Sequence, residues 1–546
     1  MKKILLTTIA FLISFYSFAQ KKSQKYPAQP KLIVGITIDQ MRYDYLYRYA
    51  SKYGKGGFLR LRDQGFNHKN HQYHYALTVT AAGHAGIFTG SSPAINGIVG
   101  NEWYSQSLGR SVYCVEDSTV KTVGGINAKS GQMSPKNLLT TTISDQLRLS
   151  TNFRNKIIGI AIKDRGSILP AGHSATAAYW FDTKEGNFIT SSYYMNDLPQ
   201  WVKDFNAQKL PAQLMSQTWN TILPIDQYTE STSDDQAYEQ KFAGEEKAVF
   251  PHQIVGKAGD AYGVLPATPF GNTLTKEMAL AAIKNENLGK GEFTDLLAVS
   301  FSSPDYVGHS FGPNSIEEED TFIRLDKDLE EILGFLDNWV GKENYLVFLS
   351  ADHGVMDIPG FWKQNKLPAG VLDMTKIKAE VRKTLLDKFG EGDIIRAEEN
   401  YQMYLNHKVL AEKNISIEQV FRAIRPTVLK FEGIADLINL QDLGNSNLND
   451  YQLGMFKNLH HATRGGDLGL VVRPGWFSGR TAGTTHGTAY NYDTHVPFLL
   501  YGWKIQSGET SVFTQIPDIS ATLANLLNIL EPNGCIGKPT PVTYAK

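Results

Sequence analysis

Four short runs of consecutive apolar residues, many of them β-branched, cover residues 31–38, 156–162, 296–301 and 345–350. A run without polar alternation is typical of a strand that is buried on both faces, as in a parallel sheet covered by helices. A fifth run follows at residues 496–501. We therefore predict an α/β fold with a largely parallel central sheet flanked by helices.

Helical spacing of apolar residues appears between these runs. Residues 322–336 carry apolar side chains three and four positions apart, which predicts an amphipathic helix packed on the sheet. Further helices are predicted over residues 81–88, 377–389 and 519–530, and from Ser416, which has Gln419 at capping-box spacing.

Two long segments have a weaker hydrophobic pattern. Residues 169–290 are rich in aromatic, Gly and Asn residues, and residues 362–479 lie between the fourth and fifth runs. A chain of 546 residues is long for one core, so two domains or one large domain with insertions is expected. We predict a single catalytic domain over residues 20–546, with insertions at about 169–290 and 362–479.

The first 19 residues have the features of a signal peptide. Two lysines precede an apolar run from Ile4 to Phe18, and Ser17, Phe18 and Ala19 form a small-x-small cleavage pattern. The alternative, a membrane anchor, is less favoured because the run falls short of the ~20 apolar residues that span a bilayer. We expect a periplasmic or secreted protein with no membrane partner.

The charge balance excludes some classes of partner. Lys plus Arg number 54 and Asp plus Glu number 55, so the net charge of −1 gives no general attraction to nucleic acid. An anionic substrate must therefore be bound by a local site. The two cysteines, Cys114 and Cys535, lack CxxC spacing and argue against a thiolate zinc site; whether they form a disulfide stays open.

Carboxylates and imidazoles follow the strand-like runs. Ligands of open α/β sheets collect at the carboxyl ends of the strands, so these positions are favoured for function. An aspartate and a histidine four residues apart can bind one ion from a single helical turn. Taken singly, each aspartate here could be a helix cap and each histidine a residue of the core. Taken together, they predict a metal site, formed by Asp39, Asp305, His309, Asp352, His353 and His486.

A hydroxyl and three donors accompany these ligands. Thr80 lies where an extended segment passes into a helix, but a threonine hydroxyl needs a base or a metal ion to become a nucleophile. Asn101 lies in a Gly-rich loop and is either an amide donor to an oxyanion or an Asx-turn residue. Lys163 and Arg165 would share one face if the strand geometry persists, which makes a phosphate-sized basic pair; two solvated charges are the alternative.

The donor chemistry suits Zn²⁺, with Mn²⁺ or Fe²⁺ harder to exclude. Asp305, His309 and His486 give one ion three ligands and leave a position open. Thr80 can complete the other set, which contains Asp39, Asp352 and His353. Two ions ~4 Å apart would stabilise the attacking and leaving oxygens of an in-line displacement. The predicted sets are Asp305, His309 and His486 for one ion, and Asp39, Asp352 and His353 with Thr80 for the other.

Four motifs, Thr-x-x-Gly-His, Pro-Asp-Tyr-Val-Gly-His-Ser-Phe-Gly-Pro, Ala-Asp-His-Gly and Thr-His-Gly, together resemble the alkaline phosphatase superfamily. The loop of Asn101 and the Lys163-x-Arg165 pair resemble, within it, the PafA-type phosphate-irrepressible bacterial enzymes. The resemblance covers essentially the whole mature chain. It implies the same two zinc sites, Thr80 as a nucleophile that becomes phosphothreonine, and contacts from Asn101, Lys163 and Arg165 to the phosphoryl oxygens.

The expected function is therefore a di-zinc alkaline phosphatase that hydrolyses small phosphate monoesters as a monomer. A phosphodiesterase of the same superfamily is the nearest alternative, but Lys163 and Arg165 favour the doubly charged monoester. A sulfatase needs a Cys or Ser where this chain has Thr80. A non-enzymatic metal- or phosphate-binding protein is the third possibility.

Overall fold

A computed structural model describes residues 27–543, and its centre is a ten-stranded sheet in the order β21-β2-β20-β13-β1-β12-β7-β8-β9-β6. The five middle strands are parallel, which confirms the predicted fold class. They are β13 (Tyr345–Ser350), β1 (Leu32–Ile38), β12 (Asp295–Phe301), β7 (Ile157–Ala161) and β8 (Ala177–Asp182). The predicted signal peptide, residues 1–19, lies outside the described residues.

The register brings the strand ends to one edge of the sheet. Ile38 of β1 pairs with Phe301 of β12, and Thr37 pairs with Ser350 of β13. All seven residues of β1 are buried, as the unbroken apolar run predicted. Because parallel strands end together here, the segments that follow β1, β12 and β13 start side by side.

Antiparallel strands complete the sheet on both sides. β20 (Phe498–Gly502) corresponds to the predicted last strand, but it runs antiparallel to β13. The remaining strands are β2 (Phe66–His68), β21 (Gly508–Thr510), β9 (Asn187–Ser191) and β6 (Thr122–Val123). The division into one catalytic domain with two insertions stays a prediction; β8 and β9, inside the segment 169–290, belong to the main sheet.

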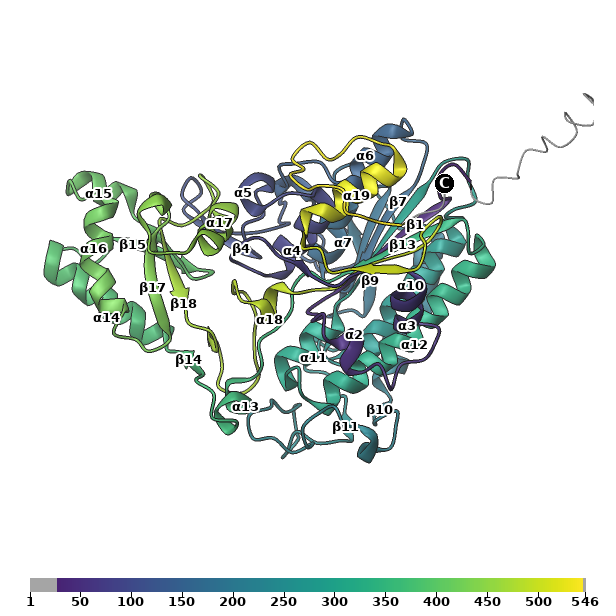
Figure 1. The fold of residues 1–546 in the computed structure, drawn as a ribbon, viewed down its shortest axis with the longest axis horizontal. Coiled ribbons are helices and arrows are strands. Elements are labelled where there is room, and N and C mark those ends of the chain that lie inside the picture. Colours follow the sequence, from purple (N-terminus) through teal and green to yellow (C-terminus); the bar gives the residue numbers. More distant parts are fainter. Residues whose placement is uncertain (1–26, 544–546) are drawn as a thin grey trace, which may run out of the picture.

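Helices cover both faces of the sheet (Figure 1). One side carries α4 (Thr80–Thr89), α6 (Ile143–Ser150), α7 (Asp164–Ala171) and α19 (Pro517–Leu527). The other carries α3 (Phe58–Gln64), α10 (Phe270–Asn285) and α12 (Ile316–Trp339). The apolar side chains predicted to pack on the sheet from residues 322–336 are buried in α12.

The second long segment builds a smaller sheet with its own apolar cluster, whose buried members all lie between residues 372 and 472. Its strand order is β15 (Ile395–Glu399), β16 (Gln402–Leu405), β18 (Leu468–Val472) and β17 (Ile434–Asn439). α14 (Met374–Phe389) and α16 (Ile417–Val428) belong to the same unit, at the left of Figure 1. Ser416 and Gln419 form the predicted capping box.

Short elements connect these layers. They are α2 (Tyr45–Arg48), β3 (His71–Gln72), α5 (Pro93–Asn96), β4 (Glu102–Ser105), β5 (Arg110–Tyr113), α8 (Gln200–Ala207), α9 (Leu210–Met215), β10 (Thr218–Trp219), β11 (His252–Gln253), α11 (Ser303–Phe311), α13 (Pro359–Gln364), β14 (Gly370–Leu372), α15 (His407–Glu412), α17 (Asp450–Leu459), β19 (Trp476–Ser478), α18 (Asn491–Thr494) and β22 (Thr514–Gln515).

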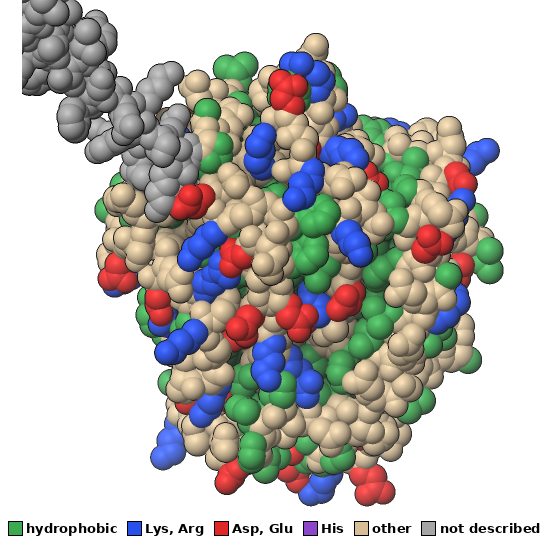
Figure 2. Space-filling model, turned by 90° about the vertical axis from the view of Figure 1, so that its right-hand side faces the viewer, with side chains coloured by type: hydrophobic (Ala, Val, Ile, Leu, Met, Phe, Trp, Pro, Cys, Tyr) green, Lys and Arg blue, Asp and Glu red, His purple; other side chains and the backbone are tan. Residues whose placement is uncertain are grey.

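The surface agrees with the near-zero net charge. Basic and acidic side chains are interspersed on the face shown in Figure 2, with no large field of one sign. Cys114 and Cys535 are both free thiols. Among residues 27–543, none of the helices combines the length and the apolar character needed to cross a bilayer.

Candidate metal centre

The three predicted aspartate ligands emerge from the same edge of the sheet. Asp39 follows β1 directly, Asp352 lies two residues after β13, and Asp305 is in the first turn of α11 after β12. Asp39 and Asp352 are fully buried, and Asp305 is 4% exposed. Three carboxylates are rarely buried together without a compensating positive charge.

Histidines join these carboxylates in two groups of possible metal ligands. Within residues 27–543, ligand atoms of Asp39, Asp352 and His353 lie within 4.8 Å of one another, and so do those of Asp305, His353 and His486. The first group is one of the two sets predicted from the sequence. The second contains His353, which the sequence had placed in only one set.

His309 approaches the second group through Asp305. Its Nε2 lies 3.2 Å from Asp305 Oδ1, and His486 Nε2 lies 3.5 Å from the same oxygen. The rings of His353 and His486 stack with their centroids 3.5 Å apart, so the two groups adjoin. All six predicted metal-ligating aspartates and histidines are therefore brought to one place.

Each of the three histidines is oriented by a backbone carbonyl. The Nδ1 atoms of His353, His309 and His486 lie 2.9, 2.8 and 2.7 Å from the carbonyl oxygens of Gly354, Thr484 and Thr78. Because a carbonyl oxygen only accepts, each Nδ1 carries the proton and donates it. The Nε2 lone pairs then face the carboxylates, which is the arrangement found in metal-ligating histidines.

Polar atoms of the first group have no hydrogen-bond partner among the described residues. They are Asp39 Oδ1, Asp352 Oδ2 and His353 Nε2. His353 Nε2 lies 3.5 Å from each of the two oxygens. Unpaired buried polar atoms destabilise a protein, and a divalent cation bound among these three would satisfy them all. The donor set therefore fits a metal ion.

The electrostatic environment favours an added positive charge. Burial raises the pKa of the Asp39 carboxyl well above its usual range, and the charges of Asp305 and Asp352 raise it further. Burial lowers the pKa of His353 to about 3, so its imidazole is neutral at pH 7 and can act as a ligand.

Lys163 bridges the two groups. Its Nζ lies 2.6 Å from Asp39 Oδ2 and 2.5 Å from Asp305 Oδ2. Burial opposes the charge on this lysine, but Asp305 and Asp39 outweigh it and raise the pKa of the ammonium group. The ammonium is therefore held among the ligands, at the end of β7. A contact from Lys163 to a phosphoryl oxygen stays a prediction.

Arg165 and Lys163 do not lie on one face of a strand, so the prediction that strand geometry pairs them was wrong. The extended backbone ends at Lys163, and α7 begins at Asp164. Arg165 Nη1 donates to the Tyr113 hydroxyl at 3.1 Å, and that hydroxyl donates to Asp164 Oδ1 at 2.5 Å. Arg165 Nε is buried and has no hydrogen-bond partner among the described residues, so the held guanidinium has one unpaired donor.

Thr80 and Asn101 are connected through the start of α4. Val79 is extended and α4 begins at Thr80, as the sequence pattern predicted, and Thr80 is 2% exposed. Asn101 Oδ1 accepts a hydrogen bond from the Ala81 N–H at 2.9 Å. With its oxygen engaged, the amide nitrogen of Asn101 is the atom that can donate to a ligand.

Two glycines allow close backbone approach at this site. A Cβ on Gly83 would lie 2.1 Å from the Asp352 carbonyl oxygen, so only glycine lets α4 pack against the ligand segment. A Cβ on Gly354 would lie 2.3 Å from the Tyr492 carbonyl oxygen. The backbone of Gly354 is not left-handed, so the requirement for glycine here comes from this close contact.

Sequence reasoning missed two residues that orient the ligands. Gln40 donates from Nε2 to Asp305 Oδ1 at 2.6 Å and from its backbone N–H to Asp352 Oδ1 at 3.1 Å. His84 donates from Nδ1 to the Thr80 carbonyl oxygen at 2.9 Å, and Asp352 Oδ2 lies 3.3 Å away. Their positions beside Asp39 and inside the Thr-x-x-Gly-His motif were the available signals.

Exchanging Gln40 for Asn is expected to weaken divalent-cation binding about tenfold, as loss of a group that orients a ligand does. Asn tolerates the left-handed backbone of residue 40 (φ 68°), but its shorter side chain cannot reach Asp305. The measurement is the metal content of each protein after equilibration with graded chelator. Identical retention by both proteins would contradict the proposed role.

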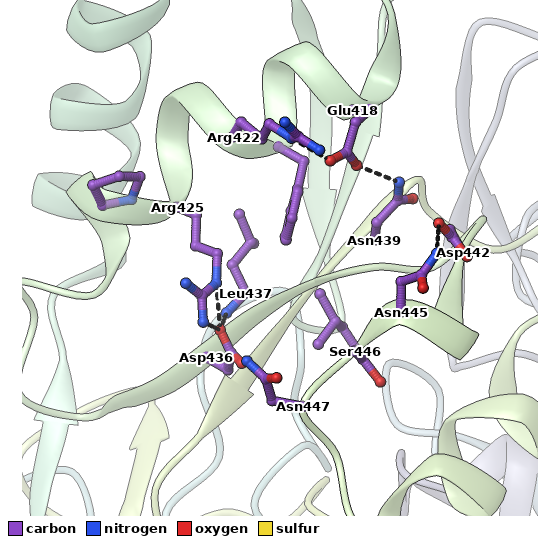
Figure 3. A pocket seen from close by; sticks show the side chains of 13 residues that line it. Glu418, Arg422, Arg425, Asp436, Leu437, Asn439, Asp442, Asn445, Ser446 and Asn447 are labelled. Atoms are coloured by element: carbon purple, nitrogen blue, oxygen red, sulfur yellow. Dashed lines mark hydrogen bonds and ion pairs between the residues drawn. The ribbon is translucent and has the colours of Figure 1, made fainter.

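A cavity of about 740 Å³ lies elsewhere, in the second long segment (Figure 3). Its two arginines are paired with acids: Arg425 Nη2 lies 2.8 Å from Asp436, and Arg422 Nε lies 2.6 Å from Glu418. Neither arginine of this cavity is therefore free to bind an anion. The two groups of metal ligands do not line this cavity, so cavity size does not identify the metal site.

The chain is similar over most of its length to known proteins. The model of the family described as type I phosphodiesterase / nucleotide pyrophosphatase matches residues 33–496. A protein of Synechococcus elongatus named alkaline phosphatase PhoV is 45% identical over 547 residues, covering 98% of each chain. A protein of Myroides odoratus named calcium-transporting ATPase is 46% identical over 538 residues, also covering 98% of each.

A solved structure is similar throughout. The crystal structure of wild-type alkaline phosphatase PafA has a TM-score of 0.90 and 46% sequence identity to this chain. The match covers 94% of this chain and 98% of that one. The PafA sequence of Elizabethkingia meningoseptica is 46% identical over 513 residues, which is 94% of each chain.

Proposed function

The chain belongs to the type I phosphodiesterase / nucleotide pyrophosphatase family, within the alkaline phosphatase superfamily, and we propose that it is an alkaline phosphatase that hydrolyses phosphate monoesters. The observation that carries the proposal is the convergence of two Asp/His groups, which share His353, beside the α4 segment that begins at Thr80. The names of similar proteins differ, so the site itself has to support the activity.

We propose two zinc ions as cofactors. When bound, they would supply the positive charge that makes a hydroxyl nucleophilic and that stabilises the departing oxygen. The residues that would hold them are Asp305, His309 and His486 for one ion, and Asp39, Asp352, His353 and Thr80 for the other.

Thr80 is the proposed nucleophile. Its hydroxyl loses its proton, Oγ1 forms a bond to phosphorus while the bond from phosphorus to the ester oxygen breaks, and the departing alkoxide takes up a proton. Water then attacks the phosphothreonine, which releases inorganic phosphate and restores the hydroxyl. The N-terminus of α4 favours the negative charge of the phosphoryl group next to Thr80.

Three side chains would bind the nonbridging phosphoryl oxygens. The amide of Asn101 is oriented by Ala81, and the guanidinium of Arg165 is held by Tyr113. Lys163 contributes a second full positive charge beside the ligands. Fixed donors and charges of this kind stabilise the phosphoryl group in the transition state without reorganising.

A phosphodiesterase is the second candidate, because the matching family model carries that description. A diester has one negative charge on its nonbridging oxygens and a monoester has two, so two cationic side chains favour the monoester. The test is kcat/KM for a monoester and a diester with the same leaving group, on protein of known zinc content. A higher value for the monoester is expected; a higher value for the diester would assign the alternative.

Removal of metal is expected to abolish hydrolysis and to lower the thermal stability of the protein. Asp39, Asp352 and Asp305 are buried close together, so loss of divalent cations leaves a repulsion among them that Lys163 compensates only in part. Zinc should restore activity and raise the unfolding midpoint with rising concentration. The measurements are unfolding midpoint, bound zinc per chain and hydrolysis after exhaustive chelation. Full activity in zinc-free protein would refute the proposal.

We also propose that the mature protein is periplasmic or secreted and monomeric. The proposed location rests on the signal-peptide features of residues 1–19. Fractionation of expressing cells and mass determination of the mature N-terminus test the location. Sedimentation of the purified protein tests the monomeric state.

A further inference from the structure

The loop that carries Asn101 is held at both ends by the second long segment of the chain. It runs from Gly97, after α5, to Glu102, where β4 begins. We propose that Asn400 and Arg464 are positioning residues that place the Asn101 amide for the phosphoryl group, so that the small sheet is part of the substrate site. This inference rests on the proposed function.

Asn400 holds the end of the loop that follows Asn101. Its Nδ2 donates to the Glu102 carbonyl oxygen at 2.6 Å. Asn400 and Tyr401 form the two-residue turn between β15 and β16, and both have a left-handed backbone, with φ of 55° and 60°. Asn is favoured in such a turn, whereas a bulky residue like Tyr is rare there. Contacts outside the hairpin therefore help to maintain this turn.

Such contacts are present on both sides of the turn. The Tyr401 hydroxyl accepts a hydrogen bond from the Ser478 N–H at 3.0 Å. Glu399 accepts a hydrogen bond from the hydroxyl of Ser111 in β5, the strand that pairs with β4. The turn is thus connected to the rest of the second long segment and to the hairpin that extends the Asn101 loop.

Arg464 holds the other end of the loop. Its Nη1 donates to the carbonyl oxygens of Gly97 and Asn137, each at 2.6 Å. Its guanidinium also lies 5.0 Å from the ring centroid of Trp103 in β4. The backbone of Arg464 is held in turn, because its carbonyl accepts from the Tyr404 hydroxyl at 3.1 Å. A guanidinium bound to carbonyl oxygens acts here as a fixed clamp on the backbone.

Packing joins the same three parts of the protein. Ile98 and Val99 of the loop are buried, with 0% and 1% exposure. They share one apolar cluster with Ala81 of α4 and Tyr404 of β16. The cluster therefore includes the helix that begins at Thr80, the Asn101 loop and the small sheet.

Between these fixed ends, Asn101 has two hydrogen bonds of its own. Its carbonyl oxygen accepts from Cys114 N–H at 2.9 Å, and its Oδ1 accepts from Ala81 N–H at 2.9 Å. The direction of its Nδ2 therefore depends on where the loop lies relative to α4. A donor that is misplaced by a fraction of an ångström loses much of its effect on a transition state.

Asn400→Gly is the direct test, because Gly accepts the left-handed backbone and only the side-chain contact is lost. The expected result is a decrease on the order of tenfold in monoester kcat/KM, with weaker inhibition by inorganic phosphate. Zinc content and unfolding midpoint should stay close to wild type. Asn414→Gly is the matched control: Asn414 is exposed, has φ of 52° and lies in the same long segment, between α15 and α16.

A double-mutant cycle with Asn101→Ala decides whether Asn400 acts through Asn101. In the Asn101→Ala background, Asn400→Gly is expected to cost less than about twofold, because residues that act through one contact are not additive. An undiminished tenfold loss in that background, or no loss in the wild-type background, would overturn the inference while leaving the proposed function intact. If Asn101→Ala itself has no effect on hydrolysis, the proposed phosphoryl contact fails and the inference fails with it.

Arg464→Lys provides an independent variant of the same kind. Lys keeps the charge but cannot reproduce the planar group that binds two carbonyls and lies near Trp103. A loss of severalfold in monoester kcat/KM is expected, and it should also vanish in the Asn101→Ala background. A loss that persists there would show that Arg464 acts on stability or on another part of the site.

Discussion

Thr80→Ala is expected to lower monoester kcat/KM by about a thousandfold or more, because loss of a nucleophile removes the covalent route that catalysis depends on. Thr80→Ser keeps a hydroxyl at the start of α4 and is expected to stay within about tenfold of wild type. The measurement is initial-rate hydrolysis of an aryl phosphate by metal-loaded protein of known zinc content.

Acid quenching provides a second measurement on the same proteins. Wild-type protein mixed with labelled monoester should retain label on Thr80 after denaturation, and Thr80→Ala should retain none. Substantial hydrolysis by Thr80→Ala at normal zinc content would show that water attacks phosphorus directly. Equal losses in the Ala and Ser variants would indicate that the substitution disturbs α4 and not the nucleophile.

Arg165→Ala is expected to reduce monoester hydrolysis by about a hundredfold and diester hydrolysis by less than about tenfold, because a charge-assisted contact to the nonbridging oxygens counts for more on a dianion. Arg165 is suited to this selectivity because Tyr113 and Asp164 hold its position and its Nε has no hydrogen-bond partner among the described residues. The readout is the ratio of the two kcat/KM values, measured with a common leaving group.

Arg425→Ala is the matched control for this prediction. It removes a guanidinium that is paired with Asp436 in the cavity of the second long segment (Figure 3), so neither ester should be affected. A ratio unchanged by Arg165→Ala, with both activities reduced equally, would count against a contact from Arg165 to the phosphoryl oxygens. Arg165→Lys should recover part of the monoester activity, because it restores a charge without the planar donors.

Local patterns in the sequence were enough to predict the central strands and the residues that follow them. The unbroken apolar runs became β1, β7, β12 and β13, and the ligand-type side chains at their ends lie together. The prediction was possible because a strand buried on both faces consists of consecutive apolar residues, and because parallel strands end at one edge of the sheet. Thr80 was predictable for a similar reason, since an extended segment passes directly into a helix there.

Local patterns failed where the backbone changed direction. Lys163 and Arg165 are two residues apart, but α7 begins between them, so the alternation of a strand does not apply. The close approach of Gly354 to Tyr492 was likewise invisible, because the two segments are far apart in the chain. Periodicity predicts the type of an element better than the residue at which it ends.

The amino-acid sequence by itself determined the fold class, the set of aspartates and histidines at the sheet edge and the hydroxyl beside them. Only the tertiary structure decided that His353 belongs to both ligand groups, that Gln40 and His84 orient the ligands, and that Asn400 and Arg464 hold the Asn101 loop. Hydrophobic period and residue chemistry are properties of short segments. Distances between side chains from distant segments are fixed only when strand register and packing bring those segments together.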